Sequence, residues 1–185
     1  MLIPIVGHIY VFWHVWNIVP LHNWLKIVLL TLLSLGFVAL VFSFGVGLNK
    51  VPMPLATCIY EFGTSSIFVL LYAVMLFLLL DIGRLVHLVP KYFMYNSLLG
   101  TLTVLGILLS VFVYGNIHYN NKVRQELHLN TSKHLDKPLK VVMISDLHLG
   151  YHNRRAEFAR WVDLINAERP DLVLIAGDII DISVR

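Results

Sequence analysis

Three long runs without a charged side chain are the feature that most constrains this chain. They cover residues 27–48, 62–80 and 98–114. A helix rises about 1.5 Å per residue, so about 20 apolar residues cross a hydrocarbon layer of about 30 Å. Inside lipid, only a helix satisfies its backbone polar groups within a single segment. The sequence therefore predicts three membrane-spanning helices and excludes a single water-soluble domain.

Charge divides the chain into two regions of very different character. Residues 1–119 contain six Asp, Glu, Lys or Arg side chains, whereas residues 120–185 contain 19. We predict a membrane region over residues 1–119, a polar linker over 120–138 and a soluble region over 139–185. The formal net charge of +3 is too small to indicate a nucleic-acid partner. The lipid bilayer is the expected partner.

The first 19 residues and the membrane orientation are less constrained. Residues 1–19 lack charged side chains but include His8 and His14. We predict a fourth helix here, with a helix lying in the membrane interface as the alternative. Basic residues are balanced on the two sides of four spans, so the side that carries the soluble region stays undecided for this multi-pass protein. Glu61 and Asp81 lie at predicted helix ends, where we expect them to anchor the helix at the membrane interface, with functional intramembrane carboxylates as the alternative. In this interpretation Asp81 can pair with Arg84, three residues further on.

The soluble region has the pattern of one βαβ unit. Residues 139–144 and 172–176 are mostly apolar and include β-branched Val and Ile, which is typical of buried strands. Between them, residues 154–169 form an amphipathic helix with apolar side chains at positions i, i+3, i+4 and i+7. A strand, a helix and a strand in this order predict two parallel strands, covered on both faces. The expected fold class is an α-helical membrane region followed by the start of an α/β domain.

Polar side chains follow both predicted strands at the points where the strands end. Asp146 and His148 follow the first strand, and Asp178 follows the second. In open parallel sheets, ligands bind outside the carboxyl ends of the strands, and neighbouring strands lie about 4.8 Å apart. Two carboxylates and one imidazole suit Mn, Fe or Zn. The sequence therefore predicts a metal site formed by these three residues.

The stretches VVMISDLHLG and PDLVLIAGDIID resemble the start of a calcineurin-like metallophosphoesterase domain, as found in bacterial multi-pass membrane proteins. Asp146 and His148 match that family's D-x-H motif, and Gly177, Asp178 and Asp181 match its G-D-x-x-D motif. The resemblance implies two divalent metal ions, with Asp146 and His148 on the first, Asp178 bridging both and Asp181 orienting its surroundings. It also implies two-metal hydrolysis of a phosphomonoester or phosphodiester. Because of the membrane region, a lipid-linked or nucleotide-sugar phosphate is one candidate substrate.

The family's later motifs, G-N-H-[D/E] and G-H-x-H, do not occur in these 185 residues. We therefore expect a chain truncated after the second motif, unable by itself to assemble the complete two-metal site, with its catalytic residues unassigned. The alternatives are a non-catalytic membrane protein and a small transporter with a short cytosolic or periplasmic tail. A transporter requires ionisable residues inside its spans, and the three apolar runs have none at their centres.

Overall fold

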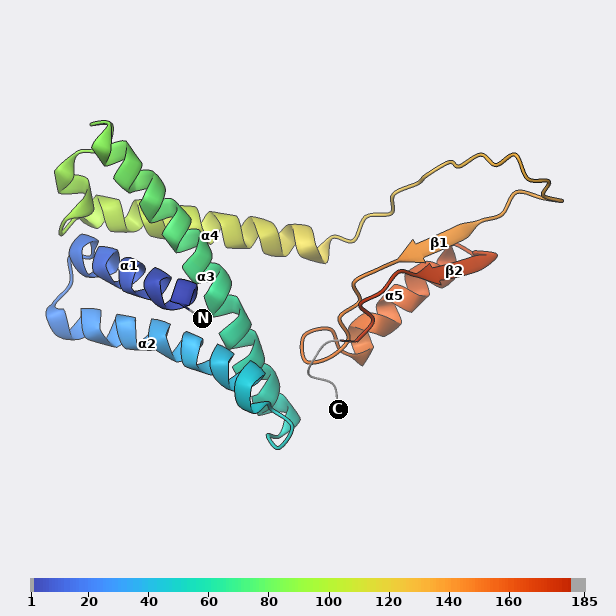
Figure 1. Ribbon diagram of the computed structural model, residues 1–185, viewed down its shortest axis with the longest axis horizontal. Helices are drawn as coiled ribbons and strands as arrows, with labels where there is room; N and C mark the ends of the chain where they lie inside the picture. Colours follow the sequence, from blue (N-terminus) through green and yellow to red (C-terminus); the bar gives the residue numbers. More distant parts are fainter. Residues whose placement is uncertain (1, 181–185) are drawn as a thin grey trace. The chain divides into compact units, whose positions relative to one another are not determined.

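The structure is a computed structural model that describes residues 2–180 (Figure 1). Its elements are α1 (Leu2–Ile18), α2 (Asn23–Val41), the π-helical turn η1 (Phe42–Val46), α3 (Met53–Leu85), the 3-10 helix η2 (Lys91–Met94), α4 (Leu98–Asn120), β1 (Val141–Ile144), α5 (Arg155–Ala167) and β2 (Leu172–Ile175). The chain forms two compact units, one of residues 1–41 and 62–123 and the other of residues 42–61 and 124–185. The predicted fold class, apolar helices followed by a βαβ unit, is confirmed.

Three helical segments are long and apolar enough to cross a membrane. They are Asn23–Val46, Met53–Leu85 and Leu98–Asn120, of 24, 33 and 23 residues. The second and third contain the charge-free runs 62–80 and 98–114, and the first contains all but the last two residues of the run 27–48. Helix α1 has 17 residues, about the lower limit for crossing a hydrocarbon layer. A fourth span therefore stays a prediction.

Small residues bring α2 and α3 into close contact. A Cβ atom added to Gly63 would lie 2.6 Å from the backbone nitrogen of Leu40, and one added to Gly36 would lie 2.5 Å from the Cβ of Ser66. In lipid, helices gain little from burying apolar surface, so van der Waals contact between closely spaced backbones drives their association. The packing of α2 on α3 thus depends on glycine at position 63.

A polar contact joins α1 to α3. The Tyr10 hydroxyl donates a hydrogen bond of 2.7 Å to Asp81 Oδ2, and His14 Nε2 lies 3.0 Å from the same oxygen. The predicted pairing of Asp81 with Arg84 is wrong, because Arg84 donates instead to the Tyr95 hydroxyl at 3.4 Å. A partly buried carboxylate is stabilised by donors that are themselves desolvated. Helix α1 supplies one such donor, the Tyr10 hydroxyl, and places the buried His14 ring beside the same carboxylate oxygen.

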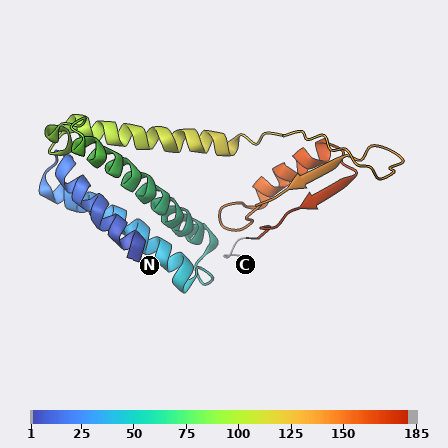
Figure 2. The ribbon, with the colours of Figure 1, turned by 45° about the horizontal axis from the view of Figure 1, so that its top comes forward.

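The βαβ unit has a parallel two-stranded sheet with α5 alongside it (Figures 1 and 2). Strands β1 and β2 pair in register from Val141↔Leu172 to Ile144↔Ile175. The expectation of strands buried on both faces is wrong for the described residues. All four residues of β2 are exposed, and β1 alternates between exposed and half-buried. One helix beside two strands leaves much of the sheet surface uncovered.

Charged side chains fasten the segment that precedes β1 to the end of α5 and the start of β2. Lys137 Nζ lies 2.7 Å from Asp171 Oδ1, while Lys140 Nζ and Arg124 Nη1 lie 2.8 and 3.0 Å from the Glu168 carboxylate. Hydrogen bonds from Lys140 and Arg124 lower the pKa of Glu168. The hydrogen bond from Lys137, and then that from the Lys140 backbone N–H, lower the pKa of Asp171.

Replacing Gly63 by alanine should destabilise the helical unit by about 1–3 kcal/mol, because the new methyl group overlaps the Leu40 backbone and forces the helices apart. Gly106→Ala is the matched control. A Cβ atom there meets nothing within 4 Å, and alanine is the better helix former. Thermal unfolding of both variants in detergent measures the difference. Equal stability would show that α2 and α3 do not pack closely at Gly63.

The Asp171 carboxyl should titrate below its ordinary pKa of about 3.9. A lowered pKa in the folded state means that the contact with Lys137 stabilises the fold above the unfolded pKa. That stabilisation is lost as the pH falls through the lowered value. NMR of the carboxyl carbon gives the midpoint directly. Lys137→Met or high salt should raise it toward the ordinary value. A midpoint at or above 3.9 in the unmodified chain would contradict the contact.

Candidate metal centre

The parallel pairing of the strands places the predicted ligand residues at one edge of the sheet. Asp146 and His148 follow β1, and Asp178 follows β2. Backbone hydrogen bonds continue beyond the strand ends. The Ala176 N–H donates to the Ile144 carbonyl at 2.8 Å, and the His148 N–H donates to the Asp178 carbonyl at 2.9 Å. The loops that carry the ligand residues are therefore joined to each other through their backbones.

The side chains of Asp146, His148 and Asp178 come together at this edge. One potential ligand atom from each residue lies within 4.8 Å of those of the other two. His148 Nε2 is 4.0 Å from Asp146 Oδ1. All three residues are exposed, so solvent and a solute can reach them. Over residues 2–180, no other group of three His, Cys, Asp or Glu side chains converges in this way. Their role as metal ligands stays a prediction.

The backbone at these residues is left-handed. The φ angles of Asp146, His148 and Asp178 are +54°, +41° and +44°. They make up half of the six non-glycine residues with positive φ in the described chain. This conformation costs about 1–2 kcal/mol per residue relative to ordinary backbone. Strained backbone concentrates where surrounding structure imposes it for a function. The strain at all three residues therefore supports a functional site here.

The donor set fits a divalent cation. Neither Asp146 nor Asp178 forms an ion pair with Lys or Arg anywhere in the described part of the chain. Two neighbouring carboxylates repel each other unless a proton or a cation lies between them. The neutral form of the His148 imidazole supplies a nitrogen ligand of the borderline type that Mn, Fe and Zn accept. The structure shows the cluster but neither the identity nor the number of ions.

Asn153 and Tyr151, two residues of the loop after His148, were not identified as supporting residues from the sequence. The amide Nδ2 of Asn153, a buried residue, donates 3.0 Å to the Leu147 carbonyl, and the Gly150 N–H donates 3.0 Å to the Asn153 carbonyl. Tyr151, which lies between Gly150 and Asn153 in the sequence, is also buried. Asparagine is a common turn residue, and its place just after the D-x-H motif was the available signal. The predicted orienting residue Asp181 lies outside the described residues.

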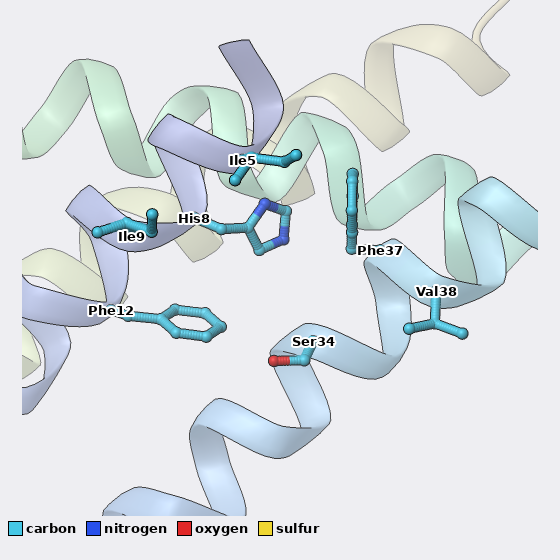
Figure 3. A pocket seen from close by; sticks show the side chains of 7 residues that line it. All are labelled: Ile5, His8, Ile9, Phe12, Ser34, Phe37 and Val38. Carbon is cyan, nitrogen blue, oxygen red and sulfur yellow. The ribbon is translucent and has the colours of Figure 1, made fainter. Parts of the chain in front are cut away.

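An apolar groove between α1 and α2 offers no comparable chemistry (Figure 3). Its volume is about 220 Å³. The residues that line it are Ile5, His8, Ile9, Phe12, Ser34, Phe37 and Val38. The His8 ring donates from Nδ1 to the Pro4 carbonyl at 2.8 Å and contacts the Phe37 ring at 4.7 Å between centroids. His8 is thus used in a hydrogen bond within α1 and in packing against Phe37 rather than in a polar site.

Comparison with known proteins supports the same chemistry. Residues 139–184 match the family described as calcineurin-like phosphoesterase. A curated relative, the uncharacterized metallophosphoesterase Cj0846 of Campylobacter jejuni, is 34% identical over 90 residues. That match covers 47% of this chain and 24% of the relative, so the chain spans about a quarter of the relative's length. No solved structure matches. The resemblance predicted from the two motifs is confirmed.

The match to the Campylobacter protein reaches beyond residues 139–185. Residues 139–185 number only 47, whereas the match extends over 90 residues. Part of it therefore lies within residues 1–138.

Replacing Asp178 by asparagine should weaken Mn²⁺ binding by about 100-fold or more. Loss of a partner that only orients a ligand already costs about 10–100-fold, and Asp178 is a predicted direct ligand. Asp163→Asn, which changes an exposed carboxylate on α5, is the matched control. The free Mn²⁺ signal in electron paramagnetic resonance, recorded during titration of the purified chain, measures the affinity. Equal affinity in the Asp178 and Asp163 variants would remove Asp178 from the site.

Proposed function

We propose that this chain belongs to a membrane-anchored, metal-dependent phosphoesterase and carries metal ligands of its active site. The enzyme hydrolyses a phosphomonoester or phosphodiester. The observation that carries the proposal is the convergence of Asp146, His148 and Asp178 within the segment that matches the calcineurin-like phosphoesterase family. A helix-bundle transporter or a non-catalytic membrane protein has no need of three exposed ligand side chains on left-handed backbone. The phosphoesterase assignment explains both the cluster and the strain.

The three residues have distinct tasks in this proposal. Asp146 and His148 would hold one divalent ion, and Asp178, which has two carboxylate oxygens, would be shared with a second ion. When bound, such ions polarise the phosphoryl group and lower the pKa of a water nucleophile. The chain's own contribution is to fix the ligands. The hydrogen bond from the His148 N–H to the Asp178 carbonyl couples the two loops, so the three side chains keep their relative positions when a phosphate group arrives.

The apolar helices would attach the metal-bearing region to the bilayer. We propose a multi-pass region over residues 1–119, joined by the 120–138 linker to the metal-bearing region 139–185. Three helices long and apolar enough to span a bilayer support the first of these. Because the metal-bearing region is tethered to the bilayer, a phosphoester carried by a lipid is the substrate class that the architecture favours. Its phosphate lies at the membrane surface, where the tether keeps the ligand residues.

Phosphodiester hydrolysis by the full-length protein that the gene encodes, in its native membranes, tests the proposal. Release of p-nitrophenol from bis(p-nitrophenyl) phosphate should require Mn²⁺ and stop when a chelator removes the metal. Asp178→Asn should lower the rate by about 100-fold or more, whereas Asp136→Asn in the exposed linker should leave it unchanged. The absence of metal-dependent hydrolysis of phosphodiester and phosphomonoester substrates would contradict the phosphoesterase assignment. Full activity of the Asp178 variant would contradict the role of the cluster.

A further inference from the structure

A tyrosine next to the metal cluster is buried against the connection between α2 and α3. Tyr151 lies three residues after His148 and is 1% exposed. Within the second compact unit it packs with Leu48, Ala56 and Tyr60, and its ring lies 5.4 Å from that of Tyr60 between centroids. Those three partners belong to residues 42–61, which we call the hairpin segment.

The loop that bears Tyr151 is connected by hydrogen bonds to the segments that carry the ligand residues. The Leu149 N–H donates to the Ile179 carbonyl at 2.9 Å, one residue beyond Asp178. Nearer to His148, the Asn153 side-chain amide donates a hydrogen bond of 3.0 Å to the Leu147 carbonyl. A contact that holds Tyr151 therefore also holds this edge of the βαβ unit, with the metal ligands a few residues away, beside the hairpin segment.

The length of α3 places the hairpin segment at the membrane surface. Nineteen uncharged residues separate Glu61 from Asp81, and at about 1.5 Å per residue they match a hydrocarbon layer of about 30 Å. Helix α3 begins eight residues before Glu61, at Met53. The start of α3, with Ala56 and Tyr60, then lies at the level of the lipid headgroups.

Chain topology leads the metal-bearing region to the same membrane surface. Consecutive spans cross in opposite directions, so α3 leaves the side of the hairpin segment and α4 returns to it. The chain that follows α4 therefore emerges on the same side of the membrane as the hairpin segment. This argument uses only the order and length of the helices, and it is independent of the Tyr151 contact.

The linker alone does not determine where the metal cluster lies. Residues 121–138 are exposed and have no helix or strand. Its described attachments to the βαβ unit, Arg124 to Glu168 and Lys137 to Asp171, are exposed ion pairs, and such pairs contribute only about 0–1 kcal/mol each. Without them a flexible chain of this length spans about 20–25 Å on average, so the linker permits many positions on the membrane surface. A specific contact has to select one of them, and the burial of Tyr151 provides it.

We propose that the hairpin segment is the docking surface for the metal-bearing loop, and that Tyr151 is the residue that anchors the loop there. Tyr151 is then a positioning residue, which holds the metal cluster at headgroup level beside the start of α3. The docking does not depend on the phosphoesterase assignment. The functional consequence of docking rests on the phosphoesterase assignment, because it is that the docked metal cluster meets phosphoesters at the membrane surface rather than in bulk water.

The aromatic ring, rather than the hydroxyl group, should carry the contact. The Tyr151 hydroxyl is buried without a hydrogen-bond partner among the described residues. An unpaired buried hydroxyl opposes docking, so its removal in Tyr151→Phe should preserve or strengthen the contact. Removal of the whole ring in Tyr151→Ala should release the loop.

Cross-linking of the full chain in phospholipid vesicles tests the docking without any need for activity. In a Cys58→Ser background, Lys50→Cys and His152→Cys place thiols on exposed positions within two residues of Leu48 and Tyr151. A short bis-maleimide should join them. The control pair is Lys50→Cys with Arg169→Cys, because Arg169 precedes β2 and lies at the end of the strand remote from the ligand loop. The control pair should give little product.

Variants on both sides of the contact complete the test. Tyr151→Ala and, on the hairpin segment, Leu48→Ala should each lower the cross-linking yield by about tenfold, as for other truncated anchor residues. Tyr151→Phe should retain it. Unchanged Mn²⁺ affinity in Leu48→Ala will show that the metal loop is still folded. The proposal is overturned by equal yields in the intact and Ala variants, by equal yields from the two cysteine pairs, or by loss of product in Tyr151→Phe.

Discussion

The parallel pairing of β1 with β2 is the interaction on which the candidate metal centre depends. Asp146 and Asp178 are 32 residues apart in the sequence, and they meet because both strands end at the same edge of the sheet. The register Ile144↔Ile175 and the His148–Asp178 backbone hydrogen bond set how the two loops face each other. A slip of one residue would turn alternate side chains to the other face and separate the ligand atoms.

The sequence predicted the features that local physics controls. Charge-free runs of about 20 residues identified the three long helices, since transfer of a charged side chain into hydrocarbon is costly. The D-x-H and G-D motifs identified Asp146, His148 and Asp178, because each follows an apolar strand directly. One helical crossover between those strands requires parallel pairing. The convergence of the three side chains therefore follows from the order of a few short elements.

The features that the sequence did not predict depend on contacts between distant residues. Asp81 was assigned to Arg84 by helical spacing, yet its partner His14 comes from α1. The exposure of Leu172 to Ile175 reflects what covers the sheet rather than the apolar character of the strand. Tyr151 carried no motif, and its importance emerges only from its packing on the hairpin segment. Propensity and spacing say little about any of these.

Anomalous scattering from crystals of the protein grown with Mn²⁺ tests the central claim most directly, because it locates the ion without reference to catalysis. The account predicts an anomalous peak at about 2.0–2.3 Å from ligand atoms of Asp146, His148 and Asp178. A second peak sharing Asp178 would establish the bridging role of that carboxylate. Well-ordered side chains with no anomalous peak among them, at saturating Mn²⁺, would contradict the account.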